Sequence, residues 1–267
     1  MHSKQVRPPR RPEPIIPVAP LLPVPILPVQ LRKHNRPVTW LAGTSIVLIA
    51  FLLLLPPDIR TVFWRSFQSQ AILVSMLLIF GLVAISLVWS AGQKLDNWVF
   101  LSFNLRGRRP IWLDRMMLGF TQIGSGFAAV GIALILLLAR QRPLAYELML
   151  GTLTLLMVVS LVKFLIHRSR PFISLTQARI VGFRARGRSF PSGHTSQSFF
   201  MATLMIQHFH ASVWVALLLY TIALLVGVTR MYVGAHYPRD VLAGAILGSA
   251  WGLVGVVVDS YVLNRIF

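Results

Sequence analysis

The amino-acid sequence predicts an all-α fold, a polytopic transmembrane helical bundle. Of its 267 residues, 55% are hydrophobic and only 12% are charged, whereas soluble globular domains carry about 25% charged residues. The mean hydropathy is +0.70. Apolar stretches close to the ~20 residues that a helix needs to cross hydrocarbon recur along the chain. Cysteine is absent, which excludes disulfides, thiol nucleophiles and thiolate metal sites.

Seven apolar stretches are the predicted membrane spans. They cover residues 38–55, 70–91, 119–139, 144–166, 194–210, 212–229 and 241–262. Proline-containing segments such as Pro56-Pro57 and Tyr237-Pro238 separate them, because proline disfavours the continuation of a helix. The stretch from Asp96 to Arg115 is predicted to lie at the membrane surface, since aromatic side chains suit that interface. Those aromatic residues are Trp98, Phe100, Phe103 and Trp112.

The chain divides into three predicted regions. Residues 1–37 hold 10 of the 17 prolines and seven Lys or Arg, so we expect a disordered basic tail. A ligand for a proline-reading module is the alternative reading of that tail. Residues 38–55 form an extra N-terminal span, and residues 70–262 form a membrane domain of six spans.

The strong positive charge indicates a membrane-surface partner. Lys and Arg number 26 against 7 Asp and Glu, a formal net charge of +19. The basic residues are interleaved with apolar spans, so they are suited to anionic lipid headgroups and not to nucleic acid. We therefore expect a multi-pass protein of the cell membrane with membrane lipids as partners. No pattern in the sequence fixes an oligomeric state.

Charge also predicts an orientation. With seven spans, the tail and the loops after the second, fourth and sixth spans share one face and carry 21 Lys and Arg, against 5 on the other. The positive-inside rule places that face in the cytoplasm. If residues 38–55 do not span, the comparison becomes 14 against 12. The first span therefore decides the side on which these loops lie.

Three short blocks carry the polar residues that matter most. The first runs from Lys163 to Arg170-Pro171, the second is Pro191-Ser192-Gly193-His194, and the third runs from Arg230 through His236 to Asp240. Two predicted spans separate the first two blocks from the third, so all three emerge on one face of the membrane. Together they predict a phosphate site.

Each block has its own chemistry. Lys163 and Arg170 share a helix face until Pro171 turns the chain, and an arginine fork matches phosphate oxygens while a lysine adds a point charge. Taken alone, Lys163 or Arg168 at a helix end is more typical of a side chain that snorkels to the interface. Ser192 is a predicted N-cap, and a helix N-terminus beside Gly193 suits an anion.

In the third block, Asp240 lies four residues beyond His236. A carboxylate at that offset can accept a hydrogen bond from one ring nitrogen, which leaves the other free to attack phosphorus. The plainer reading of Asp240 is a charge favoured at a helix start. Both can hold at once.

These blocks resemble the signatures of the type 2 phosphatidic acid phosphatase family, membrane lipid phosphate phosphatases related to vanadium haloperoxidases. The resemblance covers residues 70–262, and Thr229 stands where the family usually has serine. It implies that His236 is the nucleophile of a phosphohistidine mechanism, with Asp240 orienting it. It implies that His194 protonates the leaving group and then activates water.

The same resemblance assigns phosphate binding and the reaction. Lys163, Arg170, Ser192, Gly193 and Arg230 would stabilise charge in the transition state. No metal or other cofactor is expected, and the scarcity of carboxylates agrees. The expected function is metal-independent hydrolysis of phosphatidate, phosphatidylglycerophosphate or a polyprenyl diphosphate. A lipid-to-lipid phosphotransferase and a non-enzymatic protein that binds or transports anionic lipids are the alternatives.

Overall fold

The structure of the chain, a computed structural model, describes residues 46, 69–105 and 109–266, and the side chains of 256–266 are outside that description. Between residues 71 and 266 the described chain holds nine α-helices and no β-strand. The predicted all-α fold is therefore confirmed. The predicted tail at 1–37 lies outside the described residues, as does the predicted span at 38–55 except for Ile46.

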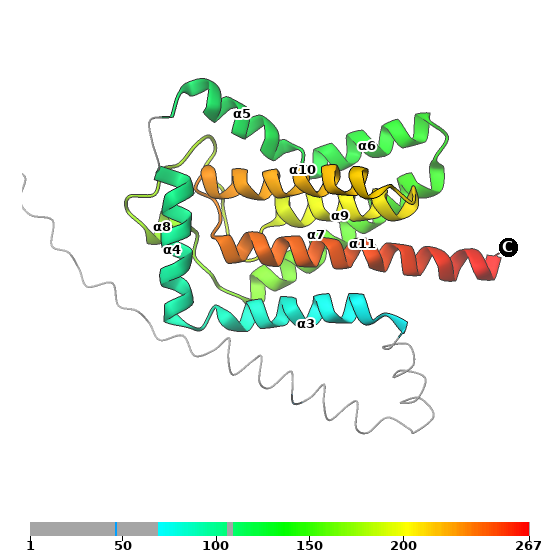
Figure 1. Cartoon of the computed structure of the whole chain (residues 1–267), viewed down its shortest axis with the longest axis horizontal. Helices are drawn as coiled ribbons and strands as arrows, with labels where there is room; N and C mark the ends of the chain where they lie inside the picture. Colours follow the sequence, from blue (N-terminus) through cyan, green and yellow to red (C-terminus); the bar gives the residue numbers. More distant parts are fainter. Residues whose placement is uncertain (1–45, 47–68, 106–108, 267) are drawn as a thin grey trace, which may run out of the picture. The chain divides into compact units, whose positions relative to one another are not determined.

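The order of the helices along the chain is shown in Figure 1, and the long connection between α8 and α9 covers residues 175–192. The helices are α3 (Ala71–Ser86), α4 (Ser90–Leu105), α5 (Ile111–Gln122), α6 (Gly126–Leu138), α7 (Arg142–Leu165), α8 (Pro171–Ser174), α9 (Gly193–His208), α10 (Val213–Tyr232) and α11 (Pro238–Ile266). Helices α7, α9 and α10 coincide with predicted spans to within three residues, because proline, glycine and polar residues mark their ends. Helix α11 begins at Pro238, as a proline in a first turn allows.

The structure has two sharp bends between successive helices, and the second lies within the span predicted over 119–139. Helices α3 and α4 meet at 96°, and α5 and α6 meet at 58°. At the second bend Ser125 caps α6 by accepting a hydrogen bond from the N–H of Ala128 at 3.2 Å. A Cβ atom at Gly124 would overlap the carbonyl oxygen of His194. The bend thus brings the end of α5 against the start of α9, which a straight helix over 119–139 would not do.

The membrane-spanning capacity of the described helices follows from length and composition. Helices α7 and α10 are each long and apolar enough to cross a bilayer, and the two bent pairs raise the number to as many as four among the described residues. Helix α9 has only 16 residues and a polar first half. The predicted count of seven spans stays a prediction.

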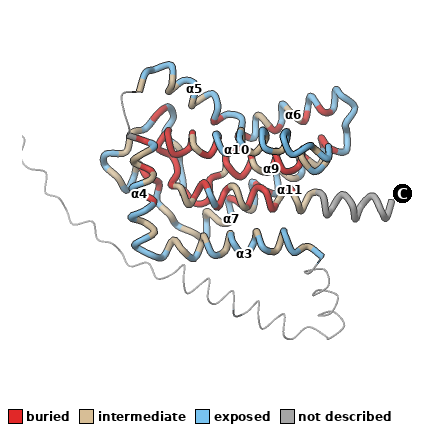
Figure 2. Tube along the Cα trace, in the orientation of Figure 1, coloured by how far each residue is buried: buried red, intermediate tan, exposed pale blue. Residues whose placement is uncertain are grey.

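Helix α9 lies at the centre of the bundle, where buried residues gather (Figure 2). It packs extensively against α11 through Gly244, Gly248 and Gly252, whose missing side chains let the backbones approach closely. A Cβ atom at Gly248 would overlap the carbonyl oxygen of Ser196. These three glycines recur every four residues and so lie on one face of α11, which is the face that contacts α9.

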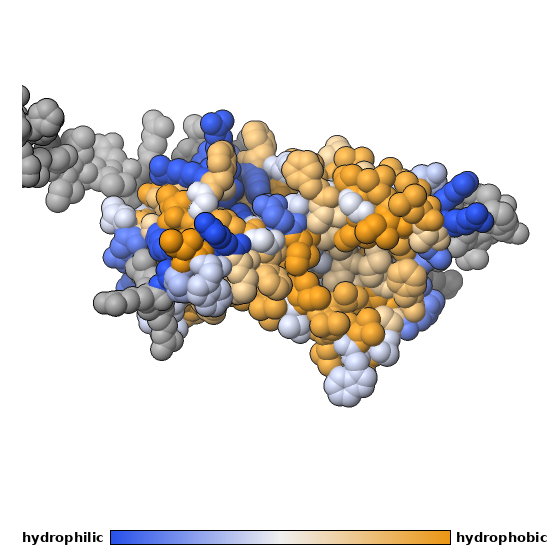
Figure 3. All heavy atoms as spheres, turned by 90° about the horizontal axis from the view of Figure 1, so that it is seen from above, coloured by the Kyte–Doolittle hydropathy of each residue, from blue (hydrophilic) through white to orange (hydrophobic). Residues whose placement is uncertain are grey.

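The outer surface is apolar where a bilayer would surround it. Seen from above, apolar side chains cover the middle of the molecule and hydrophilic ones gather toward its two ends (Figure 3). Phe127 of α6 is 88% exposed, and Trp214 of α10 is also exposed. These exposed apolar side chains form an apolar belt around the middle of the visible face. Transfer of such side chains out of water is favourable, so the belt suits a lipid environment.

Helix α4 has an inward face that the sequence did not predict. Asp96, Phe100 and Asn104 recur every four residues and are all buried, whereas Trp98 points outward and is exposed. The assignment of Phe100 to the membrane interface was wrong, because its ring packs edge-on against that of Tyr237 instead. Helix α4 therefore contacts the third block through the rings of Phe100 and Tyr237.

Candidate functional site

The three blocks meet at one end of the bundle. The N–H of Ser192 donates to the carbonyl of Asp240 at 2.9 Å, which joins the second block to the third. The N–H of Ser189 donates to the carbonyl of Arg168 at 3.0 Å, which joins the segment before the second block to the first. The structure therefore brings the three blocks together.

Arg170 connects the first block to the third. Helix α7 ends at Leu165, and Arg170 has an extended backbone before Pro171 opens α8. Its buried guanidinium donates to the carbonyls of Ala235 and Arg186, both at 3.0 Å, and of Gly187 at 3.1 Å. One terminal nitrogen, Nη1, lies 3.3 Å from Nε2 of His236. These contacts fix the cation beside the imidazole.

His236 and Asp240 form a buried pair. Nδ1 of His236 lies 3.7 Å from Oδ2 of Asp240, and the two side chains are 3% and 0% exposed. That separation is longer than a hydrogen bond. Oδ2 of Asp240 also accepts the N–H of Tyr237 at 2.8 Å. The carboxylate thus faces Nδ1, and Nε2 is left as the nitrogen on the side of Arg170.

The electrostatics around His236 keep its ring neutral. Burial lowers the pKa of His236 far below its ordinary value, and the charges of Arg170 and Arg230 lower it further, while the Asp240 carboxylate opposes them. A neutral imidazole has an unshared electron pair on one nitrogen. His236 therefore has the protonation state that a nucleophile requires.

His194 and Arg230 border a common pocket. The guanidinium of Arg230 is held at Nη1, which donates to Oγ1 of Thr121 at 2.7 Å. Lys163, Arg170 and Arg230 all lie within electrostatic range of His194. A Cβ atom at Gly193 would be 3.8 Å from Nζ of Lys163, so the glycine leaves the start of α9 open toward that amine.

Ser192 occupies the predicted N-cap position, but its side chain does not cap the helix. Its hydroxyl is fully buried and accepts a hydrogen bond from Oγ1 of Thr195 at 2.8 Å. The expected side-chain cap was wrong, because Thr195 in the first turn satisfies the hydroxyl. The N–H groups at the start of α9 are consequently not occupied by Ser192 Oγ.

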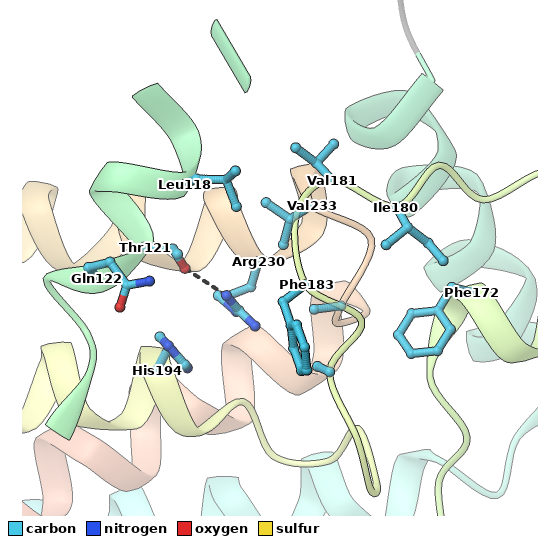
Figure 4. A pocket seen from close by; sticks show the side chains of 12 residues that line it. Leu118, Thr121, Gln122, Phe172, Ile180, Val181, Phe183, His194, Arg230 and Val233 are labelled. Atoms are coloured by element: carbon cyan, nitrogen blue, oxygen red, sulfur yellow. Dashed lines mark hydrogen bonds between the residues drawn. The ribbon is translucent and has the colours of Figure 1, made fainter. Parts of the chain in front are cut away.

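The pocket has a volume of about 200 Å³ and two chemically different ends. Gln122, Thr121, His194 and Arg230 surround one end, while apolar side chains form the other (Figure 4). The apolar lining consists of Leu118, Phe172, Ile180, Val181, Phe183, Ala185, Val233 and Ala235, of which Leu118 lies near Thr121. Thr121 and Gln122 were missed by the sequence analysis, since they stand at the bend between α5 and α6 and no motif marks them.

The other histidines lie away from this pocket. His208 ends α9, at the opposite end of the helix from Gly193, and His167 is exposed with its ring 6.2 Å from that of Phe164. Over the part of the chain that the structure describes, no group of three or more His, Asp or Glu side chains is placed to hold a metal ion.

The α-helical bundle with its apolar surface places Lys163, Arg170 and Arg230 within electrostatic range of His194. Arg170 also lies beside His236, and this combination of groups is suited to phosphate. Residues 142–263 match the model of the PAP2 superfamily. The chain is 30% identical over 191 residues to phosphatidylglycerophosphatase B of Bacillus subtilis, an alignment covering 66% of this chain and 88% of that protein. The chain belongs to the PAP2 superfamily.

Two further similarities agree with that assignment. The chain is 26% identical to an undecaprenyl-diphosphatase of Sulfolobus acidocaldarius over 69% of its own length and 90% of the relative. The fold resembles the crystal structure of a transmembrane PAP2 type phosphatidylglycerolphosphate phosphatase from Bacillus subtilis. That similarity has a TM-score of 0.62 at 24% identity and covers 71% of this chain and 96% of the other.

Proposed function

We propose that the chain is an integral-membrane, metal-independent phosphatase of the cell membrane that hydrolyses a lipid phosphate or lipid diphosphate. One observation carries this proposal: Nε2 of a buried, neutral His236 lies 3.3 Å from Nη1 of Arg170. A phosphoryl group held by that arginine would present its phosphorus to the imidazole. Proximity and orientation of this kind lower the barrier to attack.

In the first step, Nε2 of His236 forms a bond to phosphorus and the bond from phosphorus to the leaving oxygen breaks. The electron pair of that bond goes to the leaving oxygen, which takes a proton from His194, because the negative charge of a bound phosphate favours the protonated form of that ring. The ring of His236 becomes positively charged, and the Asp240 carboxylate stabilises that charge through Nδ1. The product is a phosphohistidine.

In the second step, water attacks phosphorus and the bond from phosphorus to nitrogen breaks. His194 is now neutral and accepts the proton from water, which restores its starting state. The electron pair of the broken bond returns to Nε2 of His236. Inorganic phosphate leaves, and the lipid carries a hydroxyl or, from a diphosphate, one remaining phosphate.

Three cations are available for the phosphoryl oxygens. Among the described side chains, the Arg–carboxylate ion pairs involve Arg168, Arg179 and Arg239. Lys163, Arg170 and Arg230 are in none of these pairs. Their charges can therefore stabilise negative charge that develops on phosphate, with the start of α9 at Gly193 as a further donor region.

The pocket favours a lipid as the substrate. The apolar lining continues directly from the end that holds Arg230 and His194, so an apolar body attached to the phosphate would contact it. Relatives are named for phosphatidylglycerophosphate and undecaprenyl diphosphate. Phosphatidate, phosphatidylglycerophosphate and polyprenyl diphosphates are therefore the substrates that we propose.

The test is release of phosphate by the purified protein in detergent, with a chelator present. We expect release from at least one lipid among phosphatidate, phosphatidylglycerophosphate and undecaprenyl diphosphate. His236→Ala should lower the rate by about three orders of magnitude or more, and His208→Ala at the far end of α9 should retain it. Absence of release from every lipid, or a His236→Ala variant as fast as wild type, would contradict the proposal.

A further inference from the structure

Arg168 is buried between two carboxylates, although its place at a helix end indicated a side chain that snorkels. Its Nη1 donates to Oδ1 of Asp240 at 2.6 Å, and its Nη2 contacts Oδ2 of Asp96. Nη2 also donates to Oε1 of Gln93 at 3.0 Å. The side chain is only 9% exposed, and a buried charge-assisted pair is stronger than one in water.

The two oxygens of Asp240 have different partners. Oδ1 pairs with Arg168, whereas Oδ2 accepts the N–H of Tyr237 and faces Nδ1 of His236. Arg168 also lies over the ring of Tyr237, 4.3 Å from its centroid. Without Arg168, Oδ1 would be a buried charge lacking its counter-ion, and rotation of the carboxylate would move Oδ2 away from His236.

Asp96 holds Arg168 from the other side. Oδ2 of Asp96 also accepts from Nε of Arg239 at 2.7 Å, so two arginines and two aspartates form one cluster with no net charge. This balance matters for the phosphate. Because Arg168 is the counter-ion of Asp240, Asp240 does not need Arg170 as a counter-ion. The charge of Arg170 then remains available for phosphate.

The cluster is built by helix α4. Asp96 and Gln93 belong to α4, and Nη1 of Arg239 donates to the carbonyl of Ser86 at 2.6 Å, the last residue of α3. The 96° bend between α3 and α4 is thereby joined to the first turn of α11. Arg168 is thus positioned by α4, a helix that contributes no residue to the pocket lining.

We propose that Arg168, held by Asp96, is a positioning residue that fixes the Asp240 carboxylate so that one oxygen faces Nδ1 of His236. The inference rests on the proposed function, since its effect is on the reactivity of His236. It predicts that Arg168 affects kcat, that it does so through Asp240, and that it does not contact the substrate.

The experiment compares kcat and KM of purified variants on the lipid that wild type hydrolyses best. Arg168→Gln should lower kcat by about 10- to 100-fold with KM little changed, and Arg168→Lys should recover part of the loss. Asp96→Asn should lower kcat in the same direction. Arg115→Gln is the matched control, because Arg115 of α5 is exposed, and it should retain wild-type kcat.

A double-mutant cycle separates positioning from a general effect on folding. In an Asp240→Asn background, Arg168→Gln should cause little further loss, because the residue through which it acts is already altered. Additive losses would overturn the inference, as would a kcat of Arg168→Gln equal to that of Arg115→Gln.

Gel filtration and thermal unfolding of each variant give the second readout. If Arg168→Gln does not fold, Arg168→Lys and Asp96→Asn decide: a lowered kcat at an unchanged unfolding temperature supports the inference, and wild-type kcat in both contradicts it. An inactive wild type would instead overturn the proposed function, which keeps the two failures distinguishable.

Discussion

At the scale of single residues, surroundings decide what each side chain can do. His236 is buried beside Asp240 and Arg170, whereas His167 is exposed and has no carboxylate partner among the described salt bridges. Arg170 donates mainly to backbone carbonyls and has no carboxylate partner among the described salt bridges, while Arg168 pairs with two aspartates. The same residue types therefore perform unlike tasks within one block.

The protonation of His236 follows from this environment. Because burial and the neighbouring arginines lower its pKa, the ring should stay neutral as the pH falls through about 6.5, the ordinary histidine value. NMR of protein labelled with ¹⁵N-histidine measures this directly, with the signal assigned by its loss in His236→Gln. A midpoint near 6.5 for that signal would contradict the described environment.

The predictability of the site differs from residue to residue. The spacing within each block indicated that Lys163, Arg170, Arg230, His236 and Asp240 would converge, because each spacing is local and each block adjoins a helix end. Arg168 could not be assigned in this way. Its partners lie 72 residues away in both directions along the chain, and no local pattern pairs it with Asp96 or Asp240.

At the scale of helices, ends were predictable and bends were not. Helix α7 ends before Arg170-Pro171 and α9 begins at Gly193, as proline and serine–glycine signals indicated. The bend between α5 and α6 lies inside the single span predicted over 119–139, whereas the span predicted over 70–91 ends close to the bend between α3 and α4. The bends depend on contacts between distant elements, such as Gly124 against α9.

The glycine face between α9 and α11 should be intolerant of side chains. Gly248→Ala would force a methyl group into the carbonyl of Ser196, and overpacking of this kind costs about 1–3 kcal/mol. We expect a lower temperature of thermal unfolding in detergent, together with lower activity, since Ser192 and Asp240 lie at this helix pair.

Gly131 of α6 provides the matched control. A Cβ atom there meets nothing within 4 Å, so Gly131→Ala should preserve or raise the unfolding temperature, because alanine favours a helix over glycine by about 1 kcal/mol. Equal effects of the two substitutions would contradict the packing described for α9 and α11.

At the scale of the whole molecule, the site lies where the apolar belt ends. The three blocks follow α7 and α10 or precede α9 and α11, so a headgroup can reach the pocket while its apolar part stays beside the belt. The side of the membrane on which this happens depends on residues 38–55, which lie outside the described residues apart from Ile46.

The absence of cysteine from the chain makes its topology easy to measure. If the chain has seven spans, single cysteines at Lys4 and Gln177 should react alike with a membrane-impermeant maleimide. If the positive-inside rule also holds, both should react only after the cells are permeabilised. A cysteine at Gln141, between α6 and α7, should show the opposite pattern. Lys4 and Gln177 on opposite faces would refute the extra span.

The central claim is that His236 carries the phosphoryl group, and trapping that intermediate tests it most directly. Wild-type protein is mixed with lipid labelled with ³²P in the transferred phosphate and quenched in alkali during the first turnovers, before the intermediate is hydrolysed. We predict an acid-labile, alkali-stable label on the peptide that contains His236, and none in the His236→Ala variant. A label on any other residue, or turnover that persists without His236, would contradict the account.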